Sequence, residues 1–247
     1  MKKTTHFGYQ EIPIADKTSK VRGVFNSVAY RYDLMNDLMS VGIHRFWKRV
    51  AVESIAIRPG MQILDLASGT GDLARAMIKR TGLNGFVVLA DINHRMLSTG
   101  RDRFINSGHL KGFGWCQCDA ELLPYPENHF DRVTISFGLR NVTEKGQALA
   151  EMNRVTKPNG KVLILEFSKP TSQSLTKFYD LYSFGMLPIL GQIVTGDRES
   201  YQYLVESIRK HPDQETLKNL IEDAGFTNVT YTNLTGGIVA IHQGTKV

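Results

Sequence analysis

The chain has 247 residues, 42% of them hydrophobic and 22% charged, which fits one large α/β domain and is short for two independent ones. Its formal charge of +6 admits nucleic acid or an anionic membrane as a partner. Outside His44–Arg49 the basic residues are scattered along the sequence, which favours a solubilising surface and no nucleic-acid partner. Lys2 and Lys3 precede no apolar run, so we expect no signal peptide and a cytoplasmic location.

Residues 1–60 carry helical patterns, including Phe46–Ile57, and we expect them to form a helical cap over a single domain that spans 1–247. From residue 60 onward, apolar β-like runs alternate with helical ones. The expected strands are Gln62–Ala67, Gly85–Asp91, Phe113–Gln117, Asp131–Phe137 and Lys161–Phe167. The expected helices are Asp72–Arg80, Arg95–Asn106 and Lys145–Thr156. Strand–helix alternation predicts a parallel sheet with helices on both faces.

The C-terminal part follows a different plan. A helix begins at His211-Pro212-Asp213 and ends at Gly225, with an apolar stripe between them. Thr227–Leu234 and Ile238–His242 then read as two strands joined by a glycine-containing turn, which predicts an antiparallel hairpin. A parallel sheet that ends in such a hairpin indicates the seven-stranded, Rossmann-like class I methyltransferase fold rather than a dinucleotide-binding dehydrogenase.

Residues 174–208 form an insertion in this plan. Within it, Phe178–Thr195 contains a single charged residue, Asp180, and is interrupted by two glycines and a proline. It is too broken to indicate a membrane span. A buried helix pair and a lid with an apolar underside both stay open.

Cys116 and Cys118 lie two positions apart in an expected strand, where a mutual disulfide would be strained. We expect free thiols in a reducing compartment. A Cys-x-Cys pair supplies too few ligands for a metal, and neither His109 nor His129 stands at the spacing of a zinc site. No metal is therefore expected.

The segment Gly69-Thr70-Gly71-Asp72-Leu73-Ala74 matches the dinucleotide fingerprint G-x-G-x-x-G/A. Its charges separate the candidate cofactors. A nicotinamide cofactor would place a pyrophosphate at this helix start, where the carboxylates of Asp65 and Asp72 would repel it. S-adenosylmethionine carries a sulfonium and an ammonium, which carboxylates attract. The pattern therefore predicts S-adenosylmethionine, held in part by Asp65, Gly69, Thr70 and Gly71.

Three later positions complete the predicted cofactor site. Asp91 ends the second strand, where a carboxylate can accept both ribose hydroxyls, although it could instead cap the next helix. Asp119 and Ala120 follow the third strand, where they can address the adenine edge, although an aspartate there is often a turn residue. Ser136 ends the fourth strand, beside the expected place of the reactive methyl.

From about Val21 to its end, the chain resembles the ubiquinone/menaquinone biosynthesis C-methyltransferase family (UbiE/MenG). The resemblance rests on five segments: Tyr32–Asp37, Gly42–Lys48, Ser136–Val142, Leu165–Pro170 and His211–Gln214. It implies that Thr70, Asp91, Asp119, Ala120 and Ser136 bind the cofactor. Ser68 replaces the family's usual glycine, and Lys157-Pro158-Asn159-Gly160 replaces Lys-Pro-Gly-Gly. Asparagine tolerates a left-handed backbone, so we expect that turn to be kept.

The resemblance implies carbon methylation of a reduced, prenylated ring, which is demethylmenaquinol, 2-methoxy-6-polyprenyl-benzoquinol, or both. Such a reaction needs alignment of carbon and methyl and stabilisation of a phenolate, without a metal. Arg140 and Asn141 follow the fourth strand and are assigned to the substrate hydroxyls, although Arg140 could instead ion-pair with a nearby acid. Tyr32 and His44 come from the N-terminal family segment. His44 has a suitable pKa for a base but could simply pack near Trp47.

Competing functions stay open. A nucleic-acid methyltransferase is disfavoured because the loop Ser136–Leu139 lacks the Asn/Asp-Pro-Pro-Tyr/Phe motif of base methylation and no RNA-binding module is appended. A non-catalytic scaffold of a quinone-biosynthesis complex is disfavoured by the intact cofactor pattern. A homodimer, membership of such a complex and peripheral contact with the inner face of a membrane are open partner assignments.

Overall fold

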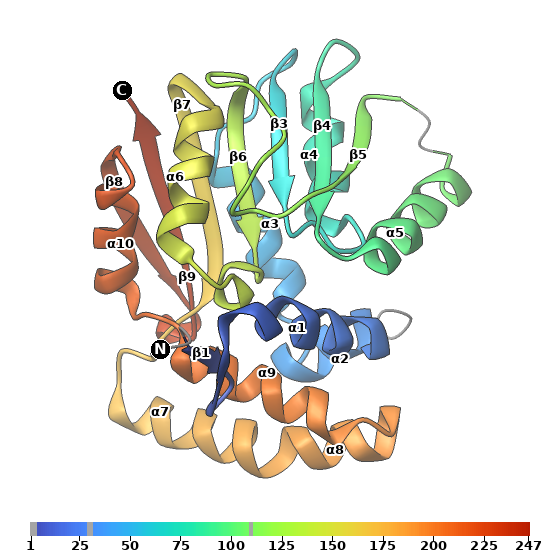
Figure 1. The fold of residues 1–247 in the computed structure, drawn as a ribbon, viewed down its shortest axis with the longest axis vertical. Helices are drawn as coiled ribbons and strands as arrows, with labels where there is room; N and C mark the ends of the chain where they lie inside the picture. Colours follow the sequence, from blue (N-terminus) through green and yellow to red (C-terminus); the bar gives the residue numbers. More distant parts are fainter. Residues whose placement is uncertain (1–3, 29–31, 109–110) are drawn as a thin grey trace.

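The computed structural model describes residues 4–28, 32–108 and 111–247. A seven-stranded sheet forms its centre, in the order β5-β4-β3-β6-β7-β9-β8 (Figure 1). The strands are β3 (Gln62–Leu66), β4 (Phe86–Asp91), β5 (Phe113–Gln117), β6 (Phe130–Ser136), β7 (Thr156–Phe167), β8 (Phe226–Leu234) and β9 (Val239–Lys246). The first five are parallel, whereas β9 is antiparallel to both β7 and β8. The predicted fold class is confirmed.

Helices cover both faces of the sheet because its strands are apolar on both sides. The covering helices are α3 (His44–Ser54), α4 (Asp72–Thr81) and α5 (His94–Asn106) on one face, and α6 (Lys145–Val155) and α10 (Gln214–Asp223) on the other. In β7, Val162 and Ile164 share a core cluster with residues of α6 and α10, whereas Leu163 and Leu165 share one with Trp47 of α3. Successive residues of a strand point to opposite faces, so a continuous apolar run requires two cores.

The turn that precedes the apolar part of β7 keeps the expected backbone. Asn159 has a φ of 62°. The left-handed conformation is therefore adopted by asparagine where the resembling family has glycine, as predicted. The strand itself begins earlier than predicted, at Thr156, directly after α6 ends at Val155.

The remaining elements gather beyond the carboxyl ends of the parallel strands, at the bottom of Figure 1. We call them the cap, which joins the N-terminal region to the insertion. They are β1 (Thr4–Phe7), β2 (Gln10–Pro13), α1 (Ile14–Val28), α2 (Tyr32–Ser40), α7 (Gln173–Asp180), the π-helix η3 (Leu181–Met186), α8 (Leu187–Thr195) and α9 (Arg198–Lys210). Two short 3-10 helices, η2 (Leu139–Asn141) and η4 (Thr235–Gly237), lie in the connections after β6 and β8. The expectation that the N-terminal region is helical is wrong for Thr4–Phe7 and Gln10–Pro13, which form the β1–β2 hairpin. Strands of four residues carry too short a pattern to be recognised without their packing partners.

The α7–η3–α8 segment is not a buried helix pair. Leu181 is 69% exposed and Ile193 is 75% exposed, so one side of the segment presents apolar side chains to solvent. The other side packs on α9, where a Cβ on Gly191 would lie 2.5 Å from the ring of Tyr201. Gly191 therefore permits close helix packing rather than breaking the helix. No helix among the described residues is long and apolar enough to cross a membrane.

Candidate active site

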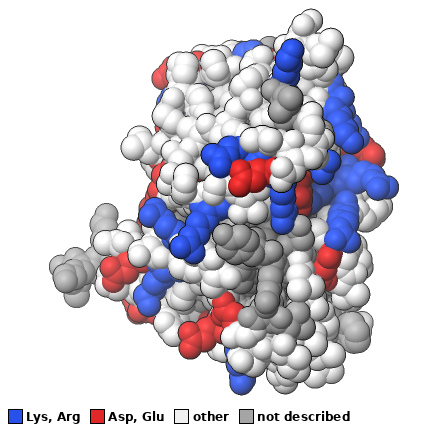
Figure 2. All heavy atoms as spheres, turned by 90° about the vertical axis from the view of Figure 1, so that its right-hand side faces the viewer, with Lys and Arg blue, Asp and Glu red and all other residues white. Residues whose placement is uncertain are grey.

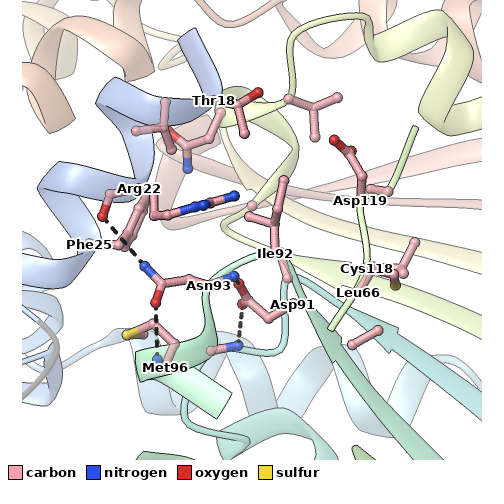
Figure 3. Close-up of a pocket in the computed structure, with 18 of the residues that line it drawn as sticks. Thr18, Arg22, Phe25, Leu66, Asp91, Ile92, Asn93, Met96, Cys118 and Asp119 are labelled. Carbon is pink, nitrogen blue, oxygen red and sulfur yellow. Dashed lines mark hydrogen bonds between the residues drawn. The ribbon is translucent and has the colours of Figure 1, made fainter. Parts of the chain in front are cut away.

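A hollow lies between α1 and the carboxyl ends of β4 and β5. Thr18, Arg22 and Phe25 of α1 line one side of it, and Asp91 and Asp119 line the other (Figure 3). Open α/β sheets form their sites at this edge, beyond the carboxyl ends of the strands. The cap and the sheet thus enclose the site together. We refer to this space as the nucleoside hollow, after the part of the cofactor that the sequence predicts at Asp91 and Asp119.

Asp91 holds the glycine-containing turn after β3 in place. Its carboxylate accepts the N–H of Gly69 at 2.9 Å through Oδ2 and the N–H of Asn93 at 2.8 Å through Oδ1. Burial raises the pKa of Asp91, and the backbone hydrogen bonds oppose that rise. A carboxylate has about four acceptor sites, so these hydrogen bonds leave room for a further donor such as a ribose hydroxyl. The helix cap, which was the alternative role for Asp91, is instead supplied by Asn93, whose Oδ1 accepts the N–H groups of Arg95 and Met96.

Asp119 shapes a turn, the alternative role, and it also lines the nucleoside hollow. Its Oδ1 accepts the N–H of Glu121 at 3.0 Å, and its carbonyl accepts the N–H of Leu122 at 3.1 Å, so it shapes a turn after β5. It also lines the nucleoside hollow, next to Ala120. A turn residue is therefore also part of the cavity wall.

Helix α1 is tied down over the nucleoside hollow near both of its ends. Lys17 donates to the carbonyl of Val142 at 3.2 Å. Asn93 Nδ2 donates to Asn26 Oδ1 at 3.1 Å and to the carbonyl of Arg22 at 3.5 Å. These contacts join α1 to the loop after β6 and to the loop after β4, which both border the cavity.

A second, smaller hollow lies on the other side of Ala67 and Phe137, which line both cavities. We call it the polar hollow. Buried oxygen atoms without a hydrogen-bond partner line it: Asp65 Oδ2, Ser68 Oγ, Thr70 Oγ1 and Ser136 Oγ. A native structure leaves few buried polar atoms unsatisfied, so this concentration indicates a polar ligand.

The charges of the polar hollow suit a zwitterionic group. Burial raises the pKa of Asp65 to about 7, and a cation beside this carboxylate would favour its ionised form. Lys48 of α3 also lines the hollow and donates to Asp72 Oδ2 at 3.0 Å. Burial disfavours the charged form of Asp72, but Lys48 holds its pKa below the ordinary value. An ammonium near Asp65 and a carboxylate near Lys48 fit this arrangement.

The glycine-containing turn between the two hollows has little room for side chains. Gly71 has a φ of 86°, and a Cβ on it would lie 2.7 Å from Phe104 and 2.8 Å from Leu89. A side chain there would therefore displace α5 or β4 as well as strain the backbone. The structure brings the eight predicted cofactor residues to this turn and to the two cavities on either side of it.

The two predicted substrate residues in the loop after β6 lie in different surroundings. Asn141 lines the nucleoside hollow. Arg140 is buried instead, and its Nη1 lies 2.9 Å from Glu166 Oε1 while also donating to the carbonyl of Phe137. The ion pair that was the alternative assignment for Arg140 is therefore the one present in the structure.

The N-terminal candidates lie elsewhere or are not described. His44 is buried at the start of α3 and contacts Asp37 Oδ1 at 3.0 Å through Nε2. It lines a groove between α3 and α4 and neither of the two site cavities. Burial lowers the pKa of His44 and so favours its neutral imidazole. Tyr32 begins α2, but its side chain lies outside the described residues.

Two features of the site are not predicted by the sequence. The α1 wall has no recognisable motif, and Lys48 lay in a family segment without a role of its own. The basic side chains are also less scattered than expected, because Arg45, Lys48 and Arg49 of α3 line one groove with Arg75, Lys79 and Arg80 of α4. Figure 2 shows Lys and Arg gathered across the middle and the right-hand edge of one face. Among the described residues, no group of three or more His, Cys, Asp or Glu could hold a metal ion.

The fold and these two cavities define a class I S-adenosylmethionine-dependent methyltransferase. One solved relative in fold is an S-adenosylmethionine-dependent methyltransferase from Thermotoga maritima, with a TM-score of 0.65 and 18% identity. The superposition covers 91% of this chain and 99% of that one.

The particular family follows from the sequence comparisons. The model of the ubiE/COQ5 methyltransferase family matches residues 14–246, and the chain belongs to this family. The ubiquinone/menaquinone biosynthesis C-methyltransferase UbiE of Pseudomonas paraeruginosa is 58% identical over 98% of this chain and 95% of the relative. That of Teredinibacter turnerae is 56% identical over 98% of each chain.

Proposed function

We propose that this chain methylates a ring carbon of a reduced, prenylated quinol in ubiquinone or menaquinone biosynthesis, using S-adenosylmethionine. The observation that carries the proposal is the placement of Asn141, from the loop after β6, in the same cavity as Asp91. A donor for a ring oxygen and an acceptor for the ribose thus share one space. The names of the curated relatives supply the substrate class.

The cofactor fits across the two cavities with its nucleoside beside Asp91 and its amino-acid end in the polar hollow. Asp91 accepts the ribose hydroxyls, and Asp119 and Ala120 face the adenine edge. Asp65 attracts the ammonium and Lys48 the carboxylate. When bound, the cofactor supplies an electrophilic methyl group on a sulfonium. Ala67 and Phe137, which separate the hollows, then lie beside the middle of the ligand.

The residues of the chain act on the ring rather than on the methyl group. A ring carbon beside a phenolic hydroxyl becomes a strong nucleophile when that hydroxyl loses its proton to water. After methylation the ring carbon gives up its hydrogen as a proton and the ring oxygen takes a proton back, so the aromatic quinol is restored and one proton is released overall. Amide donors placed at the oxygen stabilise the developing negative charge. Asn141 supplies such donors, whereas Arg140 acts by holding the loop against Glu166. His44 has a structural role at the junction of α2 and α3, away from the ring.

The prenyl tail and the membrane account for the exposed apolar surface of the cap. Ile189 and Ile193 of α8 are more than half exposed, as are Val41 in the turn between α2 and α3 and Phe46 in the first turn of α3. Helices α2 and α8 contact each other, and Tyr182 donates to the carbonyl of Leu38, so these residues belong to neighbouring elements. Arg45 and Arg49 lie beside Phe46 in sequence. Apolar side chains flanked by arginines suit peripheral contact with an anionic bilayer that holds the substrate.

A direct assay tests the proposal. Labelled S-adenosylmethionine is offered with short-chain demethylmenaquinol and short-chain methoxy-benzoquinol, each in reduced and oxidised form, and with bulk tRNA. We expect label in one or both quinols and only in the reduced form, because the oxidised ring is electron-poor. Label in tRNA with none in either quinol would contradict the substrate assignment and support only the assignment of the cofactor.

A further inference from the structure

Tyr203 connects the cap to the loop that carries Asn141. It lies on α9, is 5% exposed, and its hydroxyl donates to Asn141 Oδ1 at 3.0 Å. An amide oxygen can only accept, so the phenol must be the donor. Burial raises the pKa of Tyr203, so the hydroxyl keeps its proton throughout the physiological range.

This hydrogen bond holds the Asn141 amide in place. With Oδ1 bonded to the Tyr203 hydroxyl, the two N–H donors of Nδ2 are left for another acceptor. Among the described residues none accepts a hydrogen bond from Asn141 Nδ2, and Asn141 lines the nucleoside hollow. A hydroxyl can donate or accept, so it can bond to either end of the amide. A phenolate in the hollow attracts the N–H donors and repels the amide oxygen, and in that orientation the Tyr203 hydroxyl donates to Oδ1, as it does in the structure.

The N-terminal hairpin holds Tyr203 in place. The ring of Phe7, from β1, stacks on the ring of Tyr203 with centroids 4.1 Å apart and an interplanar angle of 17°. The N–H of Tyr9 donates to Glu206 Oε2 at 2.9 Å, which joins the hairpin to α9 one turn further on. Lys20 of α1 lies 5.4 Å from the ring centroid of Phe7. The hairpin thus packs against the ring of the tyrosine, whose hydroxyl contacts the loop after β6.

We propose that Tyr203 is a positioning residue, which sets the Asn141 amide with its donors toward the substrate oxygen and is itself held by Phe7. The inference rests on the proposed quinol methylation. Removing a preorganised donor from an oxyanion site costs roughly 100- to 1,000-fold in rate, and misdirecting one costs less. Loss of the Tyr203 hydroxyl should therefore slow methyl transfer without affecting cofactor binding.

The test uses Tyr203→Phe, which keeps the ring and its stacking on Phe7. We expect kcat for the short-chain quinol to fall by about 10- to 100-fold, with the dissociation constant of the cofactor unchanged. The acid limb of the kcat–pH profile should move to higher pH, because the phenolate is less well stabilised. Tyr231→Phe, a half-exposed tyrosine on β8, is the matched control and should leave kcat and the profile unchanged.

A double-mutant cycle separates positioning from a structural effect. If Tyr203 acts through Asn141, then Tyr203→Phe in an Asn141→Ala background should cost no further activity. Additive losses, or a Tyr203→Phe variant with wild-type kcat and pH profile, overturn the inference. Failure of the wild-type protein to methylate any quinol is a different result, because it overturns the proposed function itself.

Discussion

Arg140 and Glu166 form an ion pair that is almost fully removed from solvent, with Nη1 and Oε1 2.9 Å apart and the two side chains 3% and 1% exposed. The carboxylate also accepts the backbone N–H groups of Arg140 at 3.2 Å and of Phe167 at 2.9 Å. The guanidinium donates in turn to the carbonyl of Phe137. The pair therefore fastens the active site loop to the end of β7, from inside the protein.

Replacing one partner should destabilise the fold strongly. In Glu166→Gln the guanidinium stays buried without its counter-charge, and breaking such a pair costs about 3–5 kcal/mol of the free energy of unfolding. Urea denaturation measures this loss. Lys157→Gln, which removes a partly exposed pair with Asp131, is the control and should cost less than about 1 kcal/mol. Equal losses in the two variants would show that the buried charge is compensated by something else.

Asp91→Asn should weaken cofactor binding while the fold stays intact. An amide places an N–H group against the N–H of either Gly69 or Asn93 and provides fewer acceptors for the ribose. Hydrogen bonds to a charged group are worth about 1.5–3 kcal/mol, so we expect a roughly 10- to 100-fold higher dissociation constant. Calorimetry with S-adenosylhomocysteine measures it, and Asp102→Asn on the exposed face of α5 is the control. An unchanged affinity would place the ribose elsewhere.

Asp65 should make the protein less stable as the pH rises from about 4 to about 7. The pKa of an aspartate in an unfolded chain is about 3.9. Burial raises the pKa of Asp65 in the folded protein to about 7. Between these values the folded state binds a proton that the unfolded state has lost, so this contribution is full below about pH 4 and is lost as the pH rises through 7.

The comparison with Asp65→Asn isolates this contribution from those of other carboxylates. Asparagine does not titrate, so the difference in unfolding free energy between wild type and variant should change with pH only in this window. Chemical denaturation at a series of pH values measures the difference. A difference that is constant from pH 4 to pH 8 means that Asp65 titrates with an ordinary pKa in the folded protein.

Lys48 should contribute to cofactor affinity through the carboxylate of the ligand. For Lys48→Met we expect a roughly 10- to 100-fold weaker affinity for S-adenosylmethionine, the effect of losing one charged hydrogen bond. The same variant should bind decarboxylated S-adenosylmethionine as well as the wild type does. Lys79→Met is the control, because Lys79 lines the α3–α4 groove but not the polar hollow. A loss of affinity that is equal for both ligands would assign Lys48 to holding Asp72 alone.

The sheet and the cofactor turn could be predicted because their signals are local. A buried parallel strand is a continuous apolar run, and the turn after β3 requires glycine at Gly71, where φ is 86° and Phe104 and Leu89 approach closely. Each of these signals is contained in a few consecutive residues. The C-terminal hairpin of β8 and β9 was predicted for the same reason, from two runs joined by glycines.

The walls and supports of the site could not be predicted because they depend on packing. The role of Arg140 changes with one distant residue, Glu166, which nothing in the loop sequence identifies. Phe7 belongs to a strand of only four residues, and the ring on which it stacks, that of Tyr203, lies on α9. Phe137, which lines both cavities, has a left-handed backbone with a φ of 55°. This conformation is uncommon for phenylalanine, and the sequence does not indicate it. Such features follow from the packing of the assembled fold and not from any motif.

The exposed apolar residues of α8 give the last prediction. A double variant Ile189→Ser and Ile193→Ser removes apolar surface that burial in a bilayer would stabilise by about 25 cal/mol per Å². We expect at least about tenfold weaker binding to anionic vesicles in a flotation assay, with kcat/KM unchanged for a short-chain quinol in solution. The matched control is Leu83→Ser, because Leu83 is fully exposed in the α4–β4 connection, at the opposite edge of the sheet from the cap. If both variants bind vesicles equally well, the apolar face of α8 serves the substrate tail or another protein, and a different surface meets the bilayer.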